Sequence, residues 1–521
     1  MIAAIVHLTR LGRAGLVLAR EGVFALVDPT PLPSGARLGL KLARFLERRD
    51  AGPGSARLAA ALTKLGPSYV KLGQFMATRP DVVGKVIARD LETLQDKMAP
   101  FPQAEAEAAI TEALGKPVAE LFTKFGQPVA AASIAQVHRA EVRGPEGEHL
   151  IAVKVLRPQI EQRFQRDLDT FFFAAKLGER RSADARRLRL LAVVETMARS
   201  VAIEMDLRLE AAALVELAEN TSSDSDFRVP NVDWEHTARR VLTTEWVDGI
   251  PLADREALVR AGHDPVRLGR VLIQSFLRQA LRDGFFHADL HPGNLFVDAE
   301  GRLVAVDCGI MGRLGPKERK FLAEILFGFI TRDWHRTAEV HFEAGYVPAH
   351  HSIEDFAQAI RAIGEPIHDR PADEISMAKL LTLLFEVTGL FDMRTRPELL
   401  LLQKTMVVVE GVARGLDPKL DIWTTSEPVV REWIERHLGP VGRIEEAAVE
   451  LGGIGRMIGT AHALLSRAAA TLERFDEQTR EGLVLAPETV EAMGRSEARH
   501  WRWTSLALWV IAGLIAVWLF R

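Results

Sequence analysis

The chain is poor in cysteine, since Cys308 is the only one among 521 residues. One thiol excludes an intramolecular disulfide framework and fits a reducing compartment. A surplus of positive charge is also missing, because 66 basic residues face 70 acidic ones and the formal net charge is −4. Nucleic-acid-binding domains normally carry a strongly basic face. We therefore expect no nucleic-acid partner, and we interpret Cys308 as a small apolar filler.

Long uncharged runs are nearly absent, and the exception lies at the C-terminal end. Residues 504–520 carry no charge, and tryptophans stand at the borders of this run. Seventeen helical residues span about 26 Å, near the lower limit for a bilayer core. Three arginines precede the run and one follows it, which by the positive-inside bias places the N-terminal side in the cytoplasm. The sequence predicts a single transmembrane helix over 501–521, and the alternative is an apolar helix docked on the protein.

The N-terminal segment from Ile2 to Val27 is apolar but interrupted by arginines. The charges follow the first apolar residues, so the pattern is not that of a secretory signal peptide. A helix lying on a membrane surface and a helix packed on the body of the protein both remain open.

The most informative motif runs from His287 to Asn294 and is followed by Asp307. Phosphoryl transfer needs one carboxylate to orient the nucleophile, and an amide and a second carboxylate to hold Mg²⁺ against the phosphates. Asp289, Asn294 and Asp307 supply these three groups in the order that kinase-like folds use.

The segments around this motif fit a catalytic role. Apolar residues at helical spacing predict a helix over 267–282 that ends at Asp283-Gly284. Two β-prone runs, 295–297 and 303–306, flank a polar turn and predict a hairpin. Such a hairpin would bring the loops of Asp289 and Asp307 to one edge.

Two alternatives to phosphoryl transfer remain for these loops. The Asp and Asn residues of the motif can serve only to form turns. His287, Asp289 and His291 alternate, as transition-metal ligands do, although alternate residues in a loop before Pro292-Gly293 need not converge.

Lys154 lies within an apolar, strand-like run at 150–156, where an unpaired ammonium would be costly. Kinase-like folds hold such a lysine with a glutamate from a helix, so that it contacts the α- and β-phosphates. Glu204 and Glu210 are the candidates. On one continuous helix they would lie about 120° apart, so they would serve two different partners. Surface pairing, for instance of Glu204 with Arg208, is the plain alternative.

Together these residues resemble the UbiB family of atypical, kinase-like proteins linked to ubiquinone biosynthesis. Lys71-Leu-Gly73-Gln74 is similar to the family's KxGQ motif, and Ala130 to His138 is similar to its alanine-rich loop. A C-terminal membrane segment is also a family trait, although many members have two such helices.

The resemblance implies a role for each motif residue. Lys154 would contact the phosphates and pair with Glu210, Asp289 would be the catalytic-loop aspartate, and Asn294 and Asp307 would bind Mg²⁺. Lys71 and Gln74 of the extension would cover the cleft, with Lys71 held by Glu204 and Asp206. The nucleotide would also contact the alanine-rich loop and the hinge, which are formed by Ala130, Ala131, Ala132, Ser133, Glu245, Trp246 and Val247.

The resemblance also implies an α+β, bilobal protein-kinase-like fold with a helical N-terminal extension and a C-terminal transmembrane helix. Strands are expected at 137–142 and 150–156 and helical runs over 160–219. The expected parts are a helical, membrane-surface segment (1–55), the KxGQ extension (56–126), the N-lobe (127–249), the C-lobe (250–440), a helical linker (441–500) and the transmembrane helix (501–521).

The implied activity is that of an atypical kinase or ATPase with ATP and Mg²⁺ as cofactors. Alanines restrict the backbone where ordinary kinases use glycine, and the extension covers the cleft, so a protein substrate is disfavoured. The implied partners are membrane lipids, polyprenyl-quinone precursors and other proteins of ubiquinone biosynthesis, at the cytoplasmic face of a bacterial inner membrane. Two alternatives are a small-molecule phosphotransferase of the aminoglycoside- or choline-kinase type and a non-catalytic lipid-binding scaffold.

Overall fold

The computed structural model describes residues 2–26, 34–48, 54–77, 98–144, 147–367, 389–393 and 397–439, with single positions between 83 and 94 and at 387. The chain divides into two compact units, Met1–Ile434 and Glu435–Arg521. The helices and strands below belong to the first unit, except for the end of the last helix.

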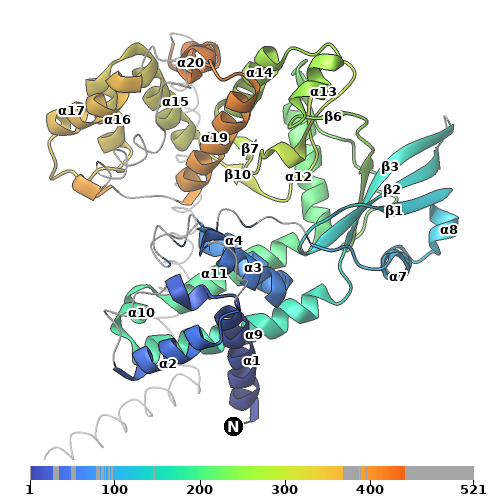
Figure 1. The fold of residues 1–521 in the computed structure, drawn as a ribbon. Coiled ribbons are helices and arrows are strands. Elements are labelled where there is room, and N and C mark those ends of the chain that lie inside the picture. Colours follow the sequence, from blue (N-terminus) through green and yellow to red (C-terminus); the bar gives the residue numbers. More distant parts are fainter. Residues whose placement is uncertain are drawn as a thin grey trace, which may run out of the picture. The chain divides into compact units, whose positions relative to one another are not determined.

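A four-stranded antiparallel sheet in the order β1-β2-β3-β5 carries Lys154. Its strands are β1 (Lys124–Ala131), β2 (Ala135–Gly144), β3 (Gly147–Leu156) and β5 (Val241–Glu245). Side chains alternate along β3: Ile151, Val153 and Val155 are buried with Phe101 and Ile110 in one apolar cluster. The short helices α7 (Gln103–Leu114) and α8 (Val118–Leu121) lie beside the sheet (Figure 1). Lys154 points away from that cluster because it alternates with Val153 and Val155.

A helical insertion separates β3 from α12 (Leu207–Asn220), the helix that contacts strand β5 of the sheet. The insertion consists of α9 (Ile160–Arg181), α10 (Ala183–Arg187) and α11 (Leu190–Glu204). The N-terminal helices pack on this insertion, with α1 and α4 both contacting α9. These elements are α1 (Ile2–Arg20), η1 (Val23–Leu26), α2 (Ser34–Phe45), α3 (Gly54–Leu65) and α4 (Pro67–Ala77). The expected helical N-terminal extension is therefore present.

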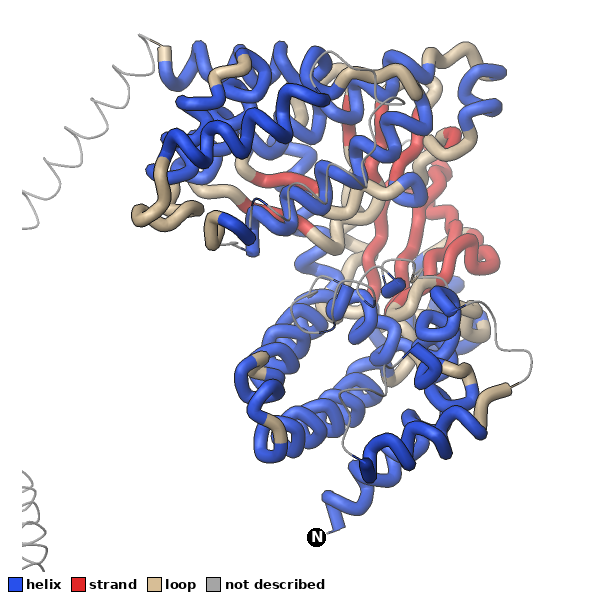
Figure 2. The backbone as a smooth tube through the Cα atoms, turned by 60° about the vertical axis from the view of Figure 1, so that its left-hand side comes forward, coloured by secondary structure: helices blue, strands red, loops and turns tan. Residues whose placement is uncertain are grey.

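Short strands and helices form the remainder, and Figure 2 shows how the strands lie among the helices. β8 and β9 form the expected hairpin, in which Leu295 pairs with Ala305. In chain order the elements are β4 (Phe227–Arg228), β6 (Ile250–Pro251), α13 (Arg255–Arg260), α14 (Pro265–Leu277), η2 (Arg278–Asp283), β7 (Phe285–His287), η3 (Pro292–Asn294), β8 (Leu295–Val297), β9 (Leu303–Ala305), β10 (Met311–Arg313), α15 (Pro316–Thr331), α16 (Trp334–Glu343), α17 (Ile353–Gly364), η4 (Glu365–Ile367), α19 (Pro397–Leu416) and α20 (Ile422–Leu438).

The helix expected over 267–282 corresponds to α14 and η2, a wider helical turn that continues it. Gly284 ends the pair with a left-handed backbone (φ 66°). A β-carbon at this position would lie 2.6 Å from the carbonyl oxygen of Leu314, so only glycine fits without displacement. The chain then enters β7, which leads directly to the catalytic motif.

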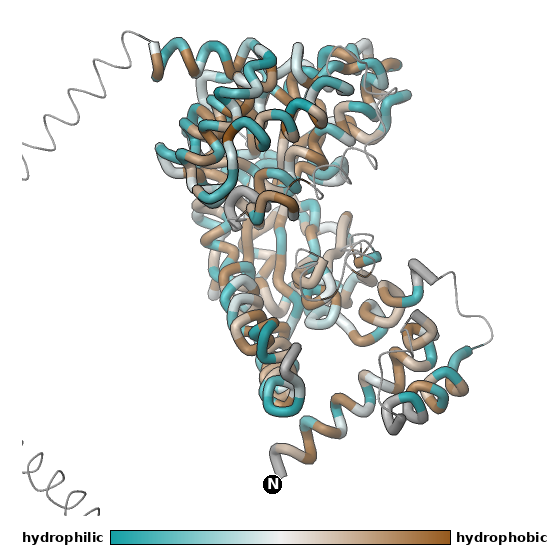
Figure 3. Tube along the Cα trace, turned by 90° about the vertical axis from the view of Figure 1, so that its left-hand side faces the viewer, coloured by the Kyte–Doolittle hydropathy of each residue, from teal (hydrophilic) through white to brown (hydrophobic). Residues whose placement is uncertain are grey.

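No helix in the described part of the chain combines the length and apolar character needed to cross a bilayer. The predicted span at 501–521 and the linker at 441–500 lie outside the described residues. Helix α1 alternates between hydrophobic and polar positions along its length (Figure 3). It packs on α9, yet Ile5, Leu8 and Leu16 remain exposed. The helix thus packs on the body of the protein, and its contact with a membrane surface stays a prediction.

Candidate active site

Lys154 joins two carboxylates that come from different parts of the chain. Its Nζ donates to both carboxylate oxygens of Glu210, at 2.7 and 2.9 Å. Asp307 Oδ2 lies 3.4 Å from the same nitrogen. Glu210 is on α12 and Asp307 follows β9, so the sheet, the helix and the loop after β9 meet at this ammonium.

The three groups of this cluster shift one another's ionisation. Burial alone would lower the pKa of the Lys154 ammonium, but the carboxylates of Asp307 and Glu210 outweigh it and the pKa is raised. Burial raises the pKa of Glu210 to about 7, although Lys154 opposes the shift. Burial also acts against ionised Asp307, yet Lys154 and the Gly309 N–H keep its pKa below the usual range. Lys154 and Asp307 are therefore charged at neutral pH.

Two hydrogen bonds fix the loop of Asp289 and join it to the loop of Asp307. The Asn294 side-chain amide donates to the Asp289 carbonyl oxygen at 3.1 Å. The Val306 N–H donates to the Asn294 carbonyl oxygen at 3.0 Å. The hairpin thus brings the loops of Asp289 and Asp307 to one edge, as its spacing predicts.

His287 is a buried support of the catalytic loop. Its Nδ1 accepts a hydrogen bond from the Asp289 backbone N–H at 3.1 Å, and the backbone N–H of His287 donates to Gln279 Oε1 at 3.1 Å. Burial lowers the pKa of this imidazole. His291 instead accepts from the Gly293 N–H, so the two imidazoles serve separate turns. His291 Nε2 lies 3.8 Å from Asp289 Oδ2, but His287 does not complete a group of three metal ligands with them.

The alanine-rich loop is fixed by protein contacts. Ala130 and Ala131 end β1, and Ala132 and Ser133 form the turn to β2. The Ala132 N–H donates to the Ala135 carbonyl oxygen at 2.8 Å. The Arg157 guanidinium donates to the Ala132 carbonyl oxygen at 2.8 and 3.1 Å. Glycine-rich loops offer their N–H groups to phosphates, whereas the Ala132 N–H already has a partner.

Arg157 and Gln136 had no assigned role in the sequence interpretation. Gln136 is buried, accepts from the Phe101 N–H at 2.9 Å and donates to the Phe101 carbonyl oxygen at 3.3 Å. Arg157 also donates to the Ala99 carbonyl oxygen at 2.9 Å. Both side chains hold the segment before α7 against the alanine-rich turn. The available signal was a polar, amide-bearing residue directly before the strand expected at 137–142.

Two of the three expected hinge amides are already engaged. The Glu245 N–H donates to the Asn231 carbonyl oxygen at 2.8 Å, and the Trp246 N–H donates to the Leu150 carbonyl oxygen at 3.2 Å. The Glu245 carboxylate pairs with Arg228 at 3.0 Å. Val247 is the expected hinge residue for which no such backbone bond is formed within the described chain.

An ion pair links helix α4 of the extension to the kinase-like part. Lys71 on α4 lies 2.5 Å from Glu204, and both side chains are largely buried. Gln74, on the same helix, is partly buried. Asp206 caps α12 by accepting from the Arg208 N–H and also binds the Arg208 guanidinium.

One premise of the sequence interpretation was wrong. Glu204 ends α11, whereas Glu210 lies in α12, so the two are not on one helix. Met205 and Asp206 break the helix because Asp206 offers its carboxylate as an N-cap. The two glutamates nevertheless have different partners, Lys71 and Lys154, and Arg208 pairs with Asp206 instead of Glu204.

The oxygen atoms of Asp307 and Asn294 fit a magnesium ion by their chemistry. Mg²⁺ prefers hard oxygen ligands and few protein ligands. The Asp307 side chain is 44% exposed, and its Oδ1 accepts a hydrogen bond from the Gly309 N–H at 3.0 Å. The amide nitrogen of Asn294 is taken by Asp289, which leaves its side-chain oxygen for a ligand. A cation and a nucleotide phosphate can therefore be held beside the Lys154 ammonium.

The sequence matches two family descriptions. Residues 93–341 match the ABC1 atypical kinase-like domain, and residues 360–421 match the UbiB helical domain. Proteins named "Probable protein kinase UbiB" are similar over most of their length. The one from Marinobacter nauticus is 38% identical over 451 residues, which cover 84% of this chain and 81% of that protein. The one from Pseudomonas entomophila is 36% identical over 485 residues, covering 91% and 90%.

A solved structure from Mycobacterium tuberculosis, described as the complex of Rv3197 with erythromycin, has a similar fold. The TM-score is 0.50 at 23% sequence identity, and the match covers 76% of this chain and 98% of that chain. At this identity the likeness concerns the fold alone. With the family matches, it confirms a kinase-like α+β fold.

Proposed function

The chain belongs to the UbiB family of ABC1-type atypical kinase-like proteins, and on this premise we propose that it is an ATP- and Mg²⁺-dependent kinase or ATPase. It acts at the membrane in support of ubiquinone biosynthesis. Membership of the family implies the pathway. The nucleotide, the cation and the membrane are the parts that this proposal adds.

The observation that carries the proposal is the ammonium of Lys154 between Glu210 and Asp307. Burying a lysine with two carboxylates costs desolvation free energy and is weak evidence for a stabilising role. Ionisable groups with such shifted pKa values cluster at functional sites. The same cluster lies next to a loop that presents Asp289 and Asn294. Phosphoryl transfer depends on placing such groups around the phosphates more than on covalent chemistry by the protein.

Each group has a definite role in this proposal. Lys154 binds the α- and β-phosphates, and Glu210 orients Lys154. Asp307 and Asn294 hold Mg²⁺, which screens the charge on the phosphates when it is bound. Asp289 orients the attacking hydroxyl or water. The alanine-rich turn, fixed by Arg157, positions the nucleotide without the close backbone approach that glycines allow.

The acceptor is water or a small hydroxylated molecule, for which the phenolic polyprenyl-quinone precursors of the membrane are the proposed source. The helices of the extension are tied to the kinase-like part through Lys71 and Glu204, so a folded protein substrate has poor access. The proposed transmembrane helix at 501–521 keeps the site near these lipids.

The test is phosphate release from Mg·ATP by the full-length protein, with and without anionic liposomes, beside Asp307→Asn. We expect release by the wild type, an increase with liposomes, and a loss of about 100-fold or more in the variant, as for removal of one transition-state-stabilising group. Glu300→Gln is the matched control, because Glu300 is an exposed carboxylate in the turn of the same hairpin and should leave release unchanged.

Three outcomes would point away from this proposal. Release that Asp307→Asn does not reduce would remove the site from the reaction. Nucleotide binding with no release, even with phenolic precursors present, would favour the lipid-binding scaffold. Transfer to an added soluble amine or sugar alcohol would instead favour the small-molecule phosphotransferase.

A further inference from the structure

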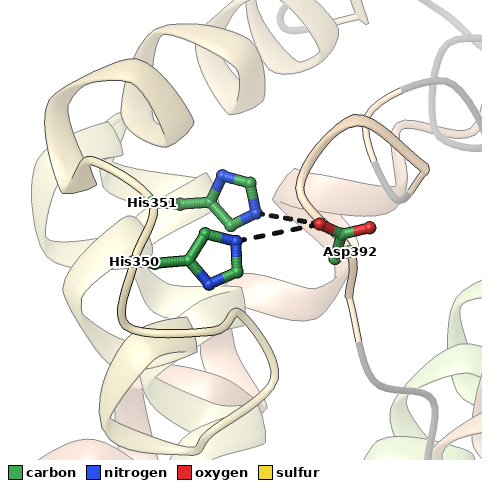
Figure 4. A group of neighbouring side chains, drawn as sticks. All are labelled: His350, His351 and Asp392. Carbon is green, nitrogen blue, oxygen red and sulfur yellow. Dashed lines mark ion pairs between the residues drawn. The ribbon is translucent and has the colours of Figure 1, made fainter.

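Three potential metal ligands converge in the helical region that follows the kinase-like core. His350 and His351 lie in the turn between α16 and α17, and Asp392 lies in the segment that precedes α19. Figure 4 shows both imidazole rings facing one oxygen of the Asp392 carboxylate. The turn and the aspartate are far apart in sequence, so no spacing motif indicates the cluster. It is the one such group of three within the residues that the structure describes.

The distances between the ligand atoms are those of a metal site. Asp392 Oδ2 lies 3.8 Å from Nε2 of His350 and 3.4 Å from Nε2 of His351. All three ligand atoms lie within 4.8 Å of one another. With Zn–N and Zn–O bonds of about 2.0–2.2 Å, the ligand atoms of a tetrahedral site are roughly 3.3–3.6 Å apart. One cation can therefore contact all three atoms after small rotations of the rings.

The positions of the ligands are set by apolar packing beneath them. Phe391 is 6% exposed and contacts Phe356 of α17 edge to face, with ring centroids 5.0 Å apart. Its ring centroid is also 5.3 Å from that of His351. Asp392 then adopts a left-handed backbone (φ 48°), a conformation that aspartate tolerates better than most residues. Phe391 is thus anchored by packing, and the carboxylate of the adjacent Asp392 reaches the imidazoles.

His351 carries an additional indication. Its Nε2 is shielded from solvent and forms no hydrogen bond, although Asp392 Oδ2 lies 3.4 Å away. Buried polar atoms nearly always have a partner, and one without it calls for an explanation. A cation in contact with this nitrogen would satisfy it. His350 and Asp392 are both exposed, which leaves a route for a metal ion to enter.

We propose that His350, His351 and Asp392 form a site for a divalent transition-metal ion of the Zn²⁺ type. Two imidazoles and one carboxylate suit zinc, whereas Mg²⁺ and Ca²⁺ prefer oxygen ligands throughout. Three protein ligands leave one coordination position for water. The ion would clamp the segment at 389–393 onto the turn before α17. The proposal does not depend on the phosphoryl-transfer site, since none of the three residues belongs to it.

The test is equilibrium binding of Zn²⁺ to full-length protein without a polyhistidine tag, in buffer with excess Mg²⁺. Competition with a chromophoric chelator gives the affinity and the stoichiometry. We expect one strong site in the wild type and a loss of about 100-fold or more in affinity for Asp392→Asn and for His351→Gln, which each remove a ligand. His350→Ala should have the same effect, and its exposed position makes misfolding an improbable cause of the loss.

Two controls separate this site from others on the chain. His335→Ala removes an exposed imidazole that also lies 3.4 Å from a carboxylate, that of Glu339, but lacks a third ligand. It should bind zinc like the wild type. Asp307→Asn should also bind normally, because the strong site is not the nucleotide site. Equal affinity in all variants, or no strong site in the wild type, would overturn the proposal.

Discussion

At the scale of single residues, the site depends on side chains that do no chemistry. His138 is fully buried in β2, and its Nδ1–H donates to the Gly126 carbonyl oxygen at 2.9 Å. Its Nε2 therefore accepts from the Gln136 amide, 2.9 Å away. Gln136 in turn holds the Phe101 backbone. Gln136 and His138, at the end of the alanine-rich motif, thus form a series of hydrogen bonds beneath the alanine-rich turn.

These linked hydrogen bonds predict that the stability of the folded protein depends on pH. Burial lowers the pKa of His138, and the Gly126 carbonyl and Glu107 only partly offset it. The folded protein therefore binds the proton less readily than the unfolded chain. The contribution of a neutral His138 is fully present above about pH 6.5 and is lost as the pH falls below that value. The slope for one proton is at most about 1.4 kcal/mol per pH unit.

Urea denaturation between pH 7.5 and 5 checks this expectation. Relative to the wild type, His138→Gln should be less stable at pH 7.5 and should lose less stability on acidification. Other buried histidines, such as His287 and His341, titrate in both proteins and cancel in the comparison. His149→Gln, at an exposed position of β3, should keep the wild-type slope. Parallel pH profiles for all three proteins would contradict the assignment.

At the scale of secondary-structure elements, the sequence pattern predicted the helices and strands that local interactions determine. The hairpin of β8 and β9 followed from two apolar runs around a polar turn, and α14 followed from helical spacing. The pairing of Lys154 with Glu210 was within reach because a buried ammonium needs a partner.

Tertiary contacts decided the elements that the pattern did not predict. Strand β1 contains one glycine, one proline and two alanines among its eight residues, all poor strand formers, so its β-structure comes from pairing with β2 and not from propensity. The break between α11 and α12 is an exception, because it depends on a local interaction, the capping of α12 by the Asp206 carboxylate. The cluster of His350, His351 and Asp392 exists only through packing between distant segments. The roles of the hinge and of the extension remain predictions.

Gly73 shows why the KxGQ motif contains a glycine. It is buried in α4, and a β-carbon there would lie 2.6 Å from Leu62 Cδ1 and within 3.3 Å of Leu91 and Leu94. Gly73→Ala should therefore force these side chains apart and destabilise the packing of α3 on α4 by about 1–3 kcal/mol. Amide hydrogen exchange within residues 54–77 measures the effect.

The control is Gly12→Ala in α1, where an added β-carbon meets nothing within 4 Å. Alanine there should stabilise the helix by up to about 1 kcal/mol. Faster exchange in Gly73→Ala and unchanged or slower exchange in Gly12→Ala would support close packing at Gly73. Identical exchange in Gly73→Ala and the wild type would show that the leucine side chains around Gly73 move aside at little cost in free energy.

At the scale of the whole molecule, the two family domains meet at the catalytic loop. Helix α19, which lies in the segment matched by the UbiB helical domain, packs on α14. The Thr405 hydroxyl of α19 donates to the Ala288 carbonyl oxygen at 3.1 Å, next to Asp289. The C-terminal helices are thus part of the support of the site.

Membrane attachment is the prediction that belongs to this scale. A chain truncated after residue 440 lacks the uncharged run of residues 504–520. We expect the full-length protein to sediment with membranes and to resist salt extraction, and the truncated chain to remain in the supernatant. Replacing residues 501–521 with an unrelated transmembrane helix should restore sedimentation. A truncated chain that still sediments would assign attachment to α1, with its exposed Ile5, Leu8 and Leu16.

The junction between α11 and α12 restricts how this chain can vary. Glu204 and Glu210 are separated by a short stretch in which Met205 and Leu207 are buried and the Leu207 N–H donates to the Arg239 carbonyl oxygen. Each residue inserted or deleted within α12 between its cap, Asp206, and Glu210 would rotate Glu210 about the helix axis by about 100°, away from Lys154. The stretch from Asp206 to Glu210 should therefore have a constant length in every functional relative, even where its residues differ.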